Sequence, residues 1–203
     1  EDSVLGKMLN RLNVMEPQQV YAVLQENGLG VSDVTPFAQM SEAAGGMLTG
    51  DSILFVDGFD RALKIPDKGY PGMSLQKTES EKAIRGSNEG FGDSIKQNTA
   101  LIRKRLCSVD LKVAECKCGR RTGTNVDIMY LDGIVRPEIV TQMQQRLAAF
   151  EIDGIGDSGV IEQLAETQWF SPFPQYQTTR RPDRAVMALL EGRAVLLTDN
   201  SPE

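Results

Sequence analysis

The residues of this chain that could support chemistry lie in short strings rich in glycine and acidic side chains. Gly156-Asp157-Ser158-Gly159 has the arrangement found around the nucleophile of trypsin-like serine proteases. In that mechanism a histidine takes the proton of the serine hydroxyl, and this sequence contains no histidine. The string is therefore interpreted as a turn followed by a helix N-cap at Asp157 or Ser158.

Gly154, Gly156 and Gly159 also match the G-x-G-x-x-G spacing of dinucleotide sites. Such a site needs a strand before the glycines and a helix after them, so that backbone N–H groups face a pyrophosphate. Here a predicted helix precedes the glycines, and Asp153 and Asp157 would place negative charge at the phosphates. No spacing singles out an acid/base pair of carboxylates either. We therefore predict no enzymatic activity, no catalytic residue and no cofactor.

The three cysteines, Cys107, Cys116 and Cys118, lie in one region. Cys116 and Cys118 are two residues apart, so in a strand they project from the same face. A zinc ion held by three thiolates would need a fourth ligand from elsewhere, and no metal site is predicted. Reduced thiols fit a domain on the cytosolic side of a membrane best.

A basic block runs from Arg85 to Arg121, where nine basic and four acidic residues give a net charge of +5, although the whole chain carries −6. Such a block suits nucleic acid, anionic lipid headgroups or an acidic face of another subunit, and it also suits a solvated helix face. Gly119-Arg120-Arg121-Thr122 lies between two predicted strands. Its two guanidinium groups are expected to face either carboxylates of another subunit or solvent. A sequence pI near 4.9 argues against nucleic acid as the partner.

The elements that must position these residues fall into two units. In the first, helices are predicted from Ser3, from Pro17 to Asn27-Gly28, and over Phe37, Met40 and Ala44 up to Gly45-Gly46, followed by two strands within residues 52–65 around a tight Asp57-Gly58 turn. Residues 66–81 hold mixed polar residues with prolines and glycines, which is typical of a linker.

The second unit alternates helices and strands. We expect a helix at about residues 93–106, followed by strands at Leu111–Cys118 and Asn125–Leu131. Two helices should come next: one from Pro137 with Ile139, Met143, Leu147 and Phe150 inward, and one that buries Ile161 and Leu164. The unit should end with a short strand at Tyr176–Thr179, a helix from Pro182 to Gly192 that carries Val186, Leu189 and Leu190, and a final strand within residues 194–198. Trp169, in an aromatic and proline-rich stretch, is interpreted as a hydrophobic plug under a loop, with a ligand platform as the alternative.

The predicted fold class is mixed α/β, with two small α/β subdomains, each built on a mixed sheet flanked by helices. The predicted boundaries are residues 1–66 for the smaller subdomain, 67–82 for an extended linker and 83–203 for the larger one. The apolar runs are far shorter than the ~20 residues that cross a bilayer, and residue 1 is Glu. We therefore expect a soluble piece of a longer protein.

Several strings, taken in order, resemble the N-terminal domain of the A subunits of spore germination receptors, the GerA family. They are LTGDSILFVDG (48–58), KGYPGMS (68–74), RGSNEGF (85–91), NTALIRKRL (98–106), GRRT (119–122), YLDGI (130–134), DGIGDSG (153–159), SPFPQYQTTRRPD (171–183) and LLEGRAVLLTDNSP (189–202). The resemblance implies a parent protein in the inner membrane of a bacterial spore, with transmembrane helices soon after Glu203. It implies assembly with B and C subunits and with other A subunits into a nutrient-sensing receptor, and no enzymatic activity.

Two functions follow as hypotheses. The first is a regulatory domain that passes nutrient binding to the membrane through contacts between subunits. Its candidate contact residues are Arg85, Asn88, Arg103, Arg105, Arg120 and Arg121, with Asp132, Asp153 and Asp157 as acidic partners. The second is a small-molecule module that binds an amino acid or sugar germinant in the cleft between the two α/β lobes.

Overall fold

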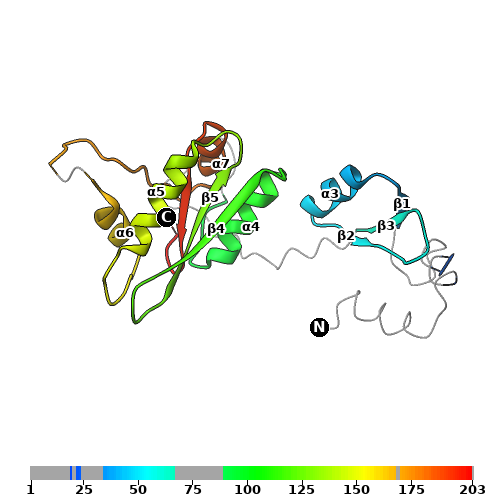
Figure 1. Ribbon diagram of the computed structural model, residues 1–203, viewed down its shortest axis with the longest axis horizontal. Helices are drawn as coiled ribbons and strands as arrows, with labels where there is room; N and C mark the ends of the chain where they lie inside the picture. Colours follow the sequence, from blue (N-terminus) through cyan, green and yellow to red (C-terminus); the bar gives the residue numbers. More distant parts are fainter. Residues whose placement is uncertain (1–18, 20–21, 24–33, 67–88, 168–169, 203) are drawn as a thin grey trace. The chain divides into compact units, whose positions relative to one another are not determined.

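The structure, a computed structural model, describes residues 19, 22–23, 34–66, 89–167 and 170–202 (Figure 1). Its contacts divide the chain into two compact units, Glu1–Gly72 and Met73–Glu203. The predicted helix at Ser3 and the predicted linker at 67–82 lie outside the described residues, and the predicted domain boundaries stay predictions. Within the helix predicted from Pro17, the described residues Gln19, Ala22 and Val23 are helical.

The first unit contains strand β1 (Thr35–Phe37), helix α3 (Met40–Leu48) and strands β2 (Ser52–Leu54) and β3 (Ala62–Ile65). The strands form an antiparallel sheet in the order β1-β3-β2, with Ser52 opposite Ile65. The predicted hairpin is confirmed, with Gly58 in the left-handed region at φ +84. Its connection is longer than a two-residue turn, because β2 ends at Leu54 and β3 begins only at Ala62.

Gly45-Gly46 was predicted to end helix α3, and this was wrong. The helix continues to Leu48, and Thr49 closes it by donating its hydroxyl to the Gly46 carbonyl at 2.9 Å. A Cβ on Gly46 would lie 3.2 Å from both Ile53 Cδ1 and Lys64 Cδ. The glycine therefore permits close packing of α3 on the sheet. Phe37, predicted to be helical, belongs to β1.

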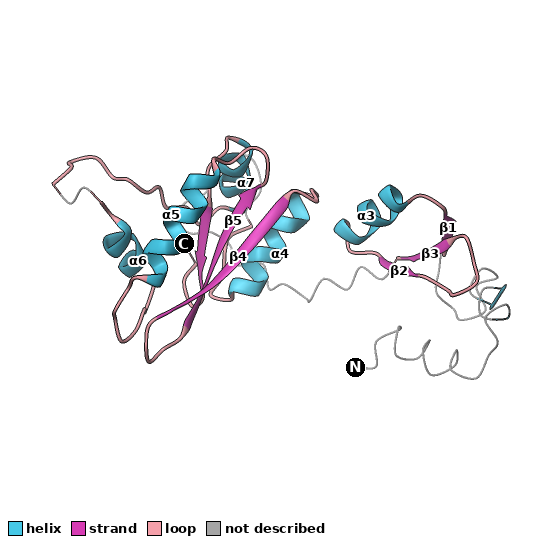
Figure 2. Ribbon diagram, in the orientation of Figure 1, coloured by secondary structure: helices cyan, strands magenta, loops and turns pink. Residues whose placement is uncertain are grey.

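The second unit has three layers (Figure 2). Its central sheet has the order β4-β5-β6, from strands β4 (Leu111–Cys118), β5 (Thr124–Leu131) and β6 (Val195–Thr198). Helices α4 (Ile95–Arg105) and α7 (Pro182–Leu190) share a core with one face of the sheet. Helices α5 (Pro137–Ala148) and α6 (Ser158–Ala165) share a core with the other face.

The central strand β5 explains why this unit closes around its sheet. Val126 and Ile128 are fully buried against α5 and α6, whereas Met129 and Leu131 are buried against α4 and α7. A strand buried on both faces loses the alternation of apolar and polar residues that a half-exposed strand keeps. Each of its large apolar side chains contributes roughly 1.5–3 kcal/mol when fully buried.

The mixed α/β class is confirmed: the described residues form five helices and two three-stranded sheets. The expected mixture of parallel and antiparallel pairing is corrected, because all strand pairs among the described residues are antiparallel. The predicted strand at Tyr176–Thr179 is a loop. The alternating pattern of residues 176–179 is typical of a strand. Side-chain hydrogen bonds hold this segment in place instead of backbone pairing with a strand: the Tyr176 hydroxyl donates to the Ala165 carbonyl.

One residue predicted to be buried is exposed, and so is a second apolar residue of a predicted helix. Leu164 in α6 exposes 39% of its surface and Leu190 at the end of α7 exposes 47%. The eight residues of α6 bury Ile161 and Ala165, four apart, which leaves Leu164 on the flank. The predicted inward position of Leu147 and the predicted burial of Ile161 are confirmed, and Val186 and Leu189 in the helix predicted from Pro182 are buried as well.

Candidate interaction surface

The C-terminal half of α4 carries three of the basic residues that suggested a contact surface. Two of them bind within the unit: Lys104 Nζ lies 2.9 Å from Glu89 Oε1, and Arg105 Nη2 lies 2.6 Å from Glu89 Oε2. These hydrogen bonds hold the pKa of Glu89 below its ordinary value, and the bond from Lys104 has the largest effect. Burial acts in the opposite direction. Arg105, a predicted contact residue, therefore forms an ion pair inside the unit, because Glu89 binds both Lys104 and Arg105 at the C-terminal end of α4.

Asn98 joins the same helix to the chain segment that precedes it. Its side chain is 1% exposed, accepts a hydrogen bond from the Gly92 N–H at 2.9 Å and donates one to the Gly92 carbonyl at 2.7 Å. The side-chain amide thus satisfies both polar groups of one buried residue. Sequence reasoning missed Asn98, although a lone asparagine beside two buried apolar positions of a helix was a signal for such a role.

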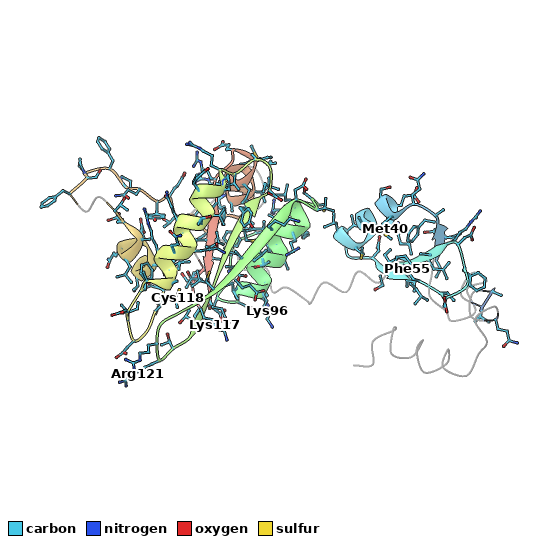
Figure 3. The ribbon with its side chains drawn as sticks, in the orientation of Figure 1. Met40, Phe55, Lys96, Lys117, Cys118 and Arg121 are labelled. Atoms are coloured by element: carbon cyan, nitrogen blue, oxygen red, sulfur yellow. The ribbon has the colours of Figure 1, made fainter. Side chains whose placement is uncertain are left out.

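The loop of the β4–β5 hairpin, residues 119–123, packs against the segment between α5 and α6. Arg120 N–H donates to the Ile152 carbonyl, and the Arg121 N–H donates to the Asp153 carbonyl, both at 2.8 Å. The Arg121 side chain, at the end of the hairpin in Figure 3, lies 3.5 Å from the Asp153 carboxylate. Since these side chains are 81% and 70% exposed, the ion pair contributes little, and the backbone bonds hold the loop.

The remaining predicted residues separate into three groups. Arg85 and Asn88 lie outside the described residues. Asp157 caps α6, because its carboxylate accepts a hydrogen bond from the Val160 N–H at 3.1 Å; this confirms the predicted N-cap. Arg103, Arg120 and Asp132 are exposed, and their side chains form no ion pair with any other described residue. Of these three, Arg103 also acts within the unit, because its charge lowers the pKa of buried Asp127.

A carboxylate that sequence reasoning did not single out lies under α4. Asp127 in β5 is 9% exposed and accepts a hydrogen bond from the Thr99 hydroxyl at 3.2 Å. Burial raises its pKa, and the neighbouring charges of Glu115 and Asp199 raise it further, against the opposing effects of the Thr99 hydrogen bond and Arg103. Asp199 itself accepts the Ile95 N–H at the start of the helix. Asp127 and Asp199 thus connect α4 to the central strand β5 and to the residue that follows β6.

The cysteines are free thiols, with Cys118 buried, Cys116 half-buried and Cys107 exposed. Cys116 and Cys118 face the core shared with α5 and α6, as their spacing predicts. Burial raises the pKa of both thiols. Across the described ranges, no group of three or more cysteine or acidic side chains could hold a metal ion.

A model of the family described as Bacillus/Clostridium GerA spore germination protein matches residues 1–203. This chain belongs to the GerA family. The match extends over the first forty-odd residues, where the quoted strings add nothing, and it confirms the resemblance.

Two relatives show the extent of the similarity. The chain is 39% identical over 177 residues to the uncharacterized membrane protein YfkQ of Bacillus subtilis (strain 168), covering 87% of this chain and 34% of that protein. It is 30% identical over 205 residues to the spore germination protein GerLA of Bacillus cereus, covering 100% of this chain and 42% of that protein. The chain thus spans well under half the length of these relatives.

One solved structure resembles the whole fold. It is the crystal structure of the N-terminal domain of the A subunit of the Bacillus megaterium spore germinant receptor GerK3. The TM-score is 0.68 at 31% identity, covering 95% of this chain and 69% of that one. Within the stretches that the structure describes, no helix is both long and apolar enough to span a bilayer.

Proposed function

We propose that this chain is the N-terminal domain of the A subunit of a nutrient germinant receptor and that it passes germinant binding to the membrane part of its parent through contacts between subunits. The observation that carries the proposal is the match to the GerK3 A-subunit domain over 95% of the chain. The partners would be the B and C subunits and other A subunits. The parent would lie in the spore inner membrane, with this domain on the core side, and neither nucleic acid nor an enzymatic step would be involved.

The physical requirement on such a domain is modest. Germinant binding shifts an assembly between two arrangements only by the difference in its binding free energy for the two, typically about 1–3 kcal/mol. A few polar contacts of partly exposed charges supply energies of that size. Arg103, Arg120 and Asp132 suit this role, since they are exposed and form no ion pair with a described residue.

Spores in which the parent gene is altered test the proposal. We expect Arg120→Asp and Asp132→Arg each to reduce germination by nutrients, and germination by a trigger that bypasses nutrient receptors to stay normal. If the two side chains meet across subunits, the double reversal restores the response; an additive loss excludes that pair. Deletion of the gene without any change in nutrient germination would refute the proposed function itself.

Direct sensing of an amino acid or sugar germinant by this domain is the alternative hypothesis. Calorimetric titration of the 203-residue chain with such germinants distinguishes it. Saturable binding at millimolar concentration or below supports direct sensing. Flat titrations with every nutrient to which the spores respond exclude it and leave transmission through contacts.

A further inference from the structure

The connection between α6 and α7 carries a segment that we call the aromatic loop, residues 167–176, TQWFSPFPQY. This loop holds the only tryptophan of the chain, two of its seven phenylalanines and one of its four tyrosines. No charged residue occurs from position 167 to position 179, although 25% of the chain is charged. The connection reaches away from the three layers of the second unit (Figure 1).

Two side chains of the aromatic loop are strongly exposed to water. Phe170 and Phe173 expose 82% and 77% of their surface, the two highest values among the large apolar side chains of the described residues. Neighbouring apolar side chains left in water mark a binding surface more often than isolated ones do.

Hydrogen bonds fix the base of the aromatic loop. The N–H and the hydroxyl of Thr167 both donate to Gln175 Oε1, at 3.1 and 2.8 Å, and so join the two ends of the loop. The Tyr176 hydroxyl donates to the Ala165 carbonyl at the end of α6, at 3.1 Å. The part of the loop that carries Phe170 and Phe173 is therefore presented outward from a fixed base.

The tip of the loop, residues 171–174, has few backbone donors that need a partner. Pro172 and Pro174 have no N–H. The Phe173 N–H donates to the Ser171 hydroxyl at 3.2 Å, and that hydroxyl donates to the Phe173 carbonyl, also at 3.2 Å. A protein partner can supply hydrogen bonds to an open backbone, whereas the apolar part of a bilayer supplies none. A tip that satisfies its own backbone groups therefore suits a lipid surface.

We propose that the aromatic loop is a membrane-contact site, which inserts Phe170 and Phe173 into the interfacial layer of a lipid bilayer. Tryptophan and tyrosine gather at this layer, because their rings are apolar and carry one polar group, and the loop also contains Trp169 and Tyr176. The inference rests on the proposed function in one respect, since that function places the parent protein in a membrane and keeps the loop near a bilayer.

The depth and strength of such a contact follow from its chemistry. Insertion stays shallow, because irregular backbone does not enter the hydrocarbon region of a bilayer. Burial of one phenylalanine side chain strengthens binding by about tenfold or more. A chain with a net charge of −6 is repelled by anionic headgroups, so apolar insertion has to provide the attraction. The free chain should therefore bind weakly, and attachment to the parent would raise the effective concentration of the loop at the bilayer.

Sedimentation of the 203-residue chain with lipid vesicles tests the site. We expect binding at millimolar lipid to vesicles of phosphatidylcholine alone, with no gain from added phosphatidylglycerol and no loss at high salt. Replacing both phenylalanines, Phe170→Ser with Phe173→Ser, should lower the partition coefficient at least about tenfold. Phe55→Ser is the matched control, because Phe55 is 61% exposed and lies in the first unit, and it should leave the partition coefficient unchanged.

Three results of this experiment would overturn the inference. The first is an absence of binding to phosphatidylcholine vesicles. The second is binding that needs phosphatidylglycerol and disappears at high salt, since that would be adsorption through basic side chains. The third is an equal loss of binding in Phe55→Ser and in the double variant.

Trp169 supplies a second readout, because it is the only tryptophan of the chain and belongs to the aromatic loop. We expect vesicles to shift its fluorescence to shorter wavelength, and lipid brominated near the headgroup end of its acyl chains to quench it. Unchanged emission from a chain that sediments with vesicles would mean that another surface binds the lipid, which also refutes the site.

The two proposals can fail separately. If the chain does not bind vesicles while the Arg120 and Asp132 reversals still impair nutrient germination, the membrane-contact site is refuted and the proposed function is not. If deletion of the gene leaves nutrient germination normal while the loop binds vesicles, the proposed function is refuted and the membrane-contact site is not.

Discussion

Replacing Asn98 by alanine removes the only side chain that, among the described residues, bonds both backbone groups of buried Gly92. A buried backbone group left without a partner costs about 1–3 kcal/mol. Losing both bonds should therefore cost about 2–6 kcal/mol, less the roughly half a kcal/mol that alanine gains over asparagine in a helix. We expect the free energy of unfolding of the second unit to fall by at least about 1.5 kcal/mol.

Urea unfolding followed by far-UV circular dichroism measures this loss, and hydrogen exchange assigns it. Peptides within residues 89–106 should exchange faster in Asn98→Ala, whereas peptides within 34–66, from the other unit, should keep their rates. Gln97→Ala is the control: it alters a half-buried neighbour on the same helix and should change stability by no more than about 0.5 kcal/mol. If Asn98→Ala costs no more than Gln97→Ala, the clamp on Gly92 does not stabilise the fold and the reasoning is refuted.

Three further changes test separate contacts. Glu89→Gln should lower the free energy of unfolding at pH 7 by about 1 kcal/mol. Because the folded pKa of Glu89 lies below 4.5, the wild-type chain keeps this contribution above pH 4.5 and loses it on further acidification. The urea midpoints of the two chains should therefore converge at low pH. Asp127→Asn should raise stability at pH 7, since burial raises the pKa of Asp127 above 3.8, and the gain should disappear once the pH falls below both folded and unfolded values; an unchanged midpoint at pH 7 would contradict it. Gly154→Ala places a Cβ 2.6 Å from Thr122 Cγ2 and should cost about 1–3 kcal/mol in a urea titration. Gly156→Ala, with nothing within 4 Å of the new Cβ, should be nearly neutral.

The larger unit was predictable where local signals agree with packing. The strand Leu111–Cys118 and the helix starts at Pro137 and Pro182 follow from alternation and from proline at the first turn, and the structure has them at those residues. The Asp157 cap follows from a short polar side chain before an apolar run. In each case a few adjacent residues decide the geometry.

The errors arise where distant residues decide. Gly46 resembles a helix terminator in the sequence, but its lack of a side chain serves contact with Ile53 and Lys64. Residues 176–179 have the composition of a strand but no neighbouring strand to pair with, and β6 pairs with β5 instead. Strand direction also depends on how long connections return, so nothing local distinguished an antiparallel sheet from a mixed one.

Some of the candidate contact residues form ion pairs inside the unit and others do not. This difference decides how a charge reversal at each position is interpreted. Two strings that suggested the family, 85–91 and 98–106, supply the members of one interlocked cluster, because Lys104 and Arg105 bind Glu89. Reversal of Arg105 would therefore break a partly buried pair and impair germination by weakening the unit, whether or not Arg105 ever meets another subunit. Reversal of Arg103 or Arg120 removes no ion pair from the described residues. A germination defect at these two positions, with the urea midpoint unchanged, is accordingly the result that points to a contact outside this chain.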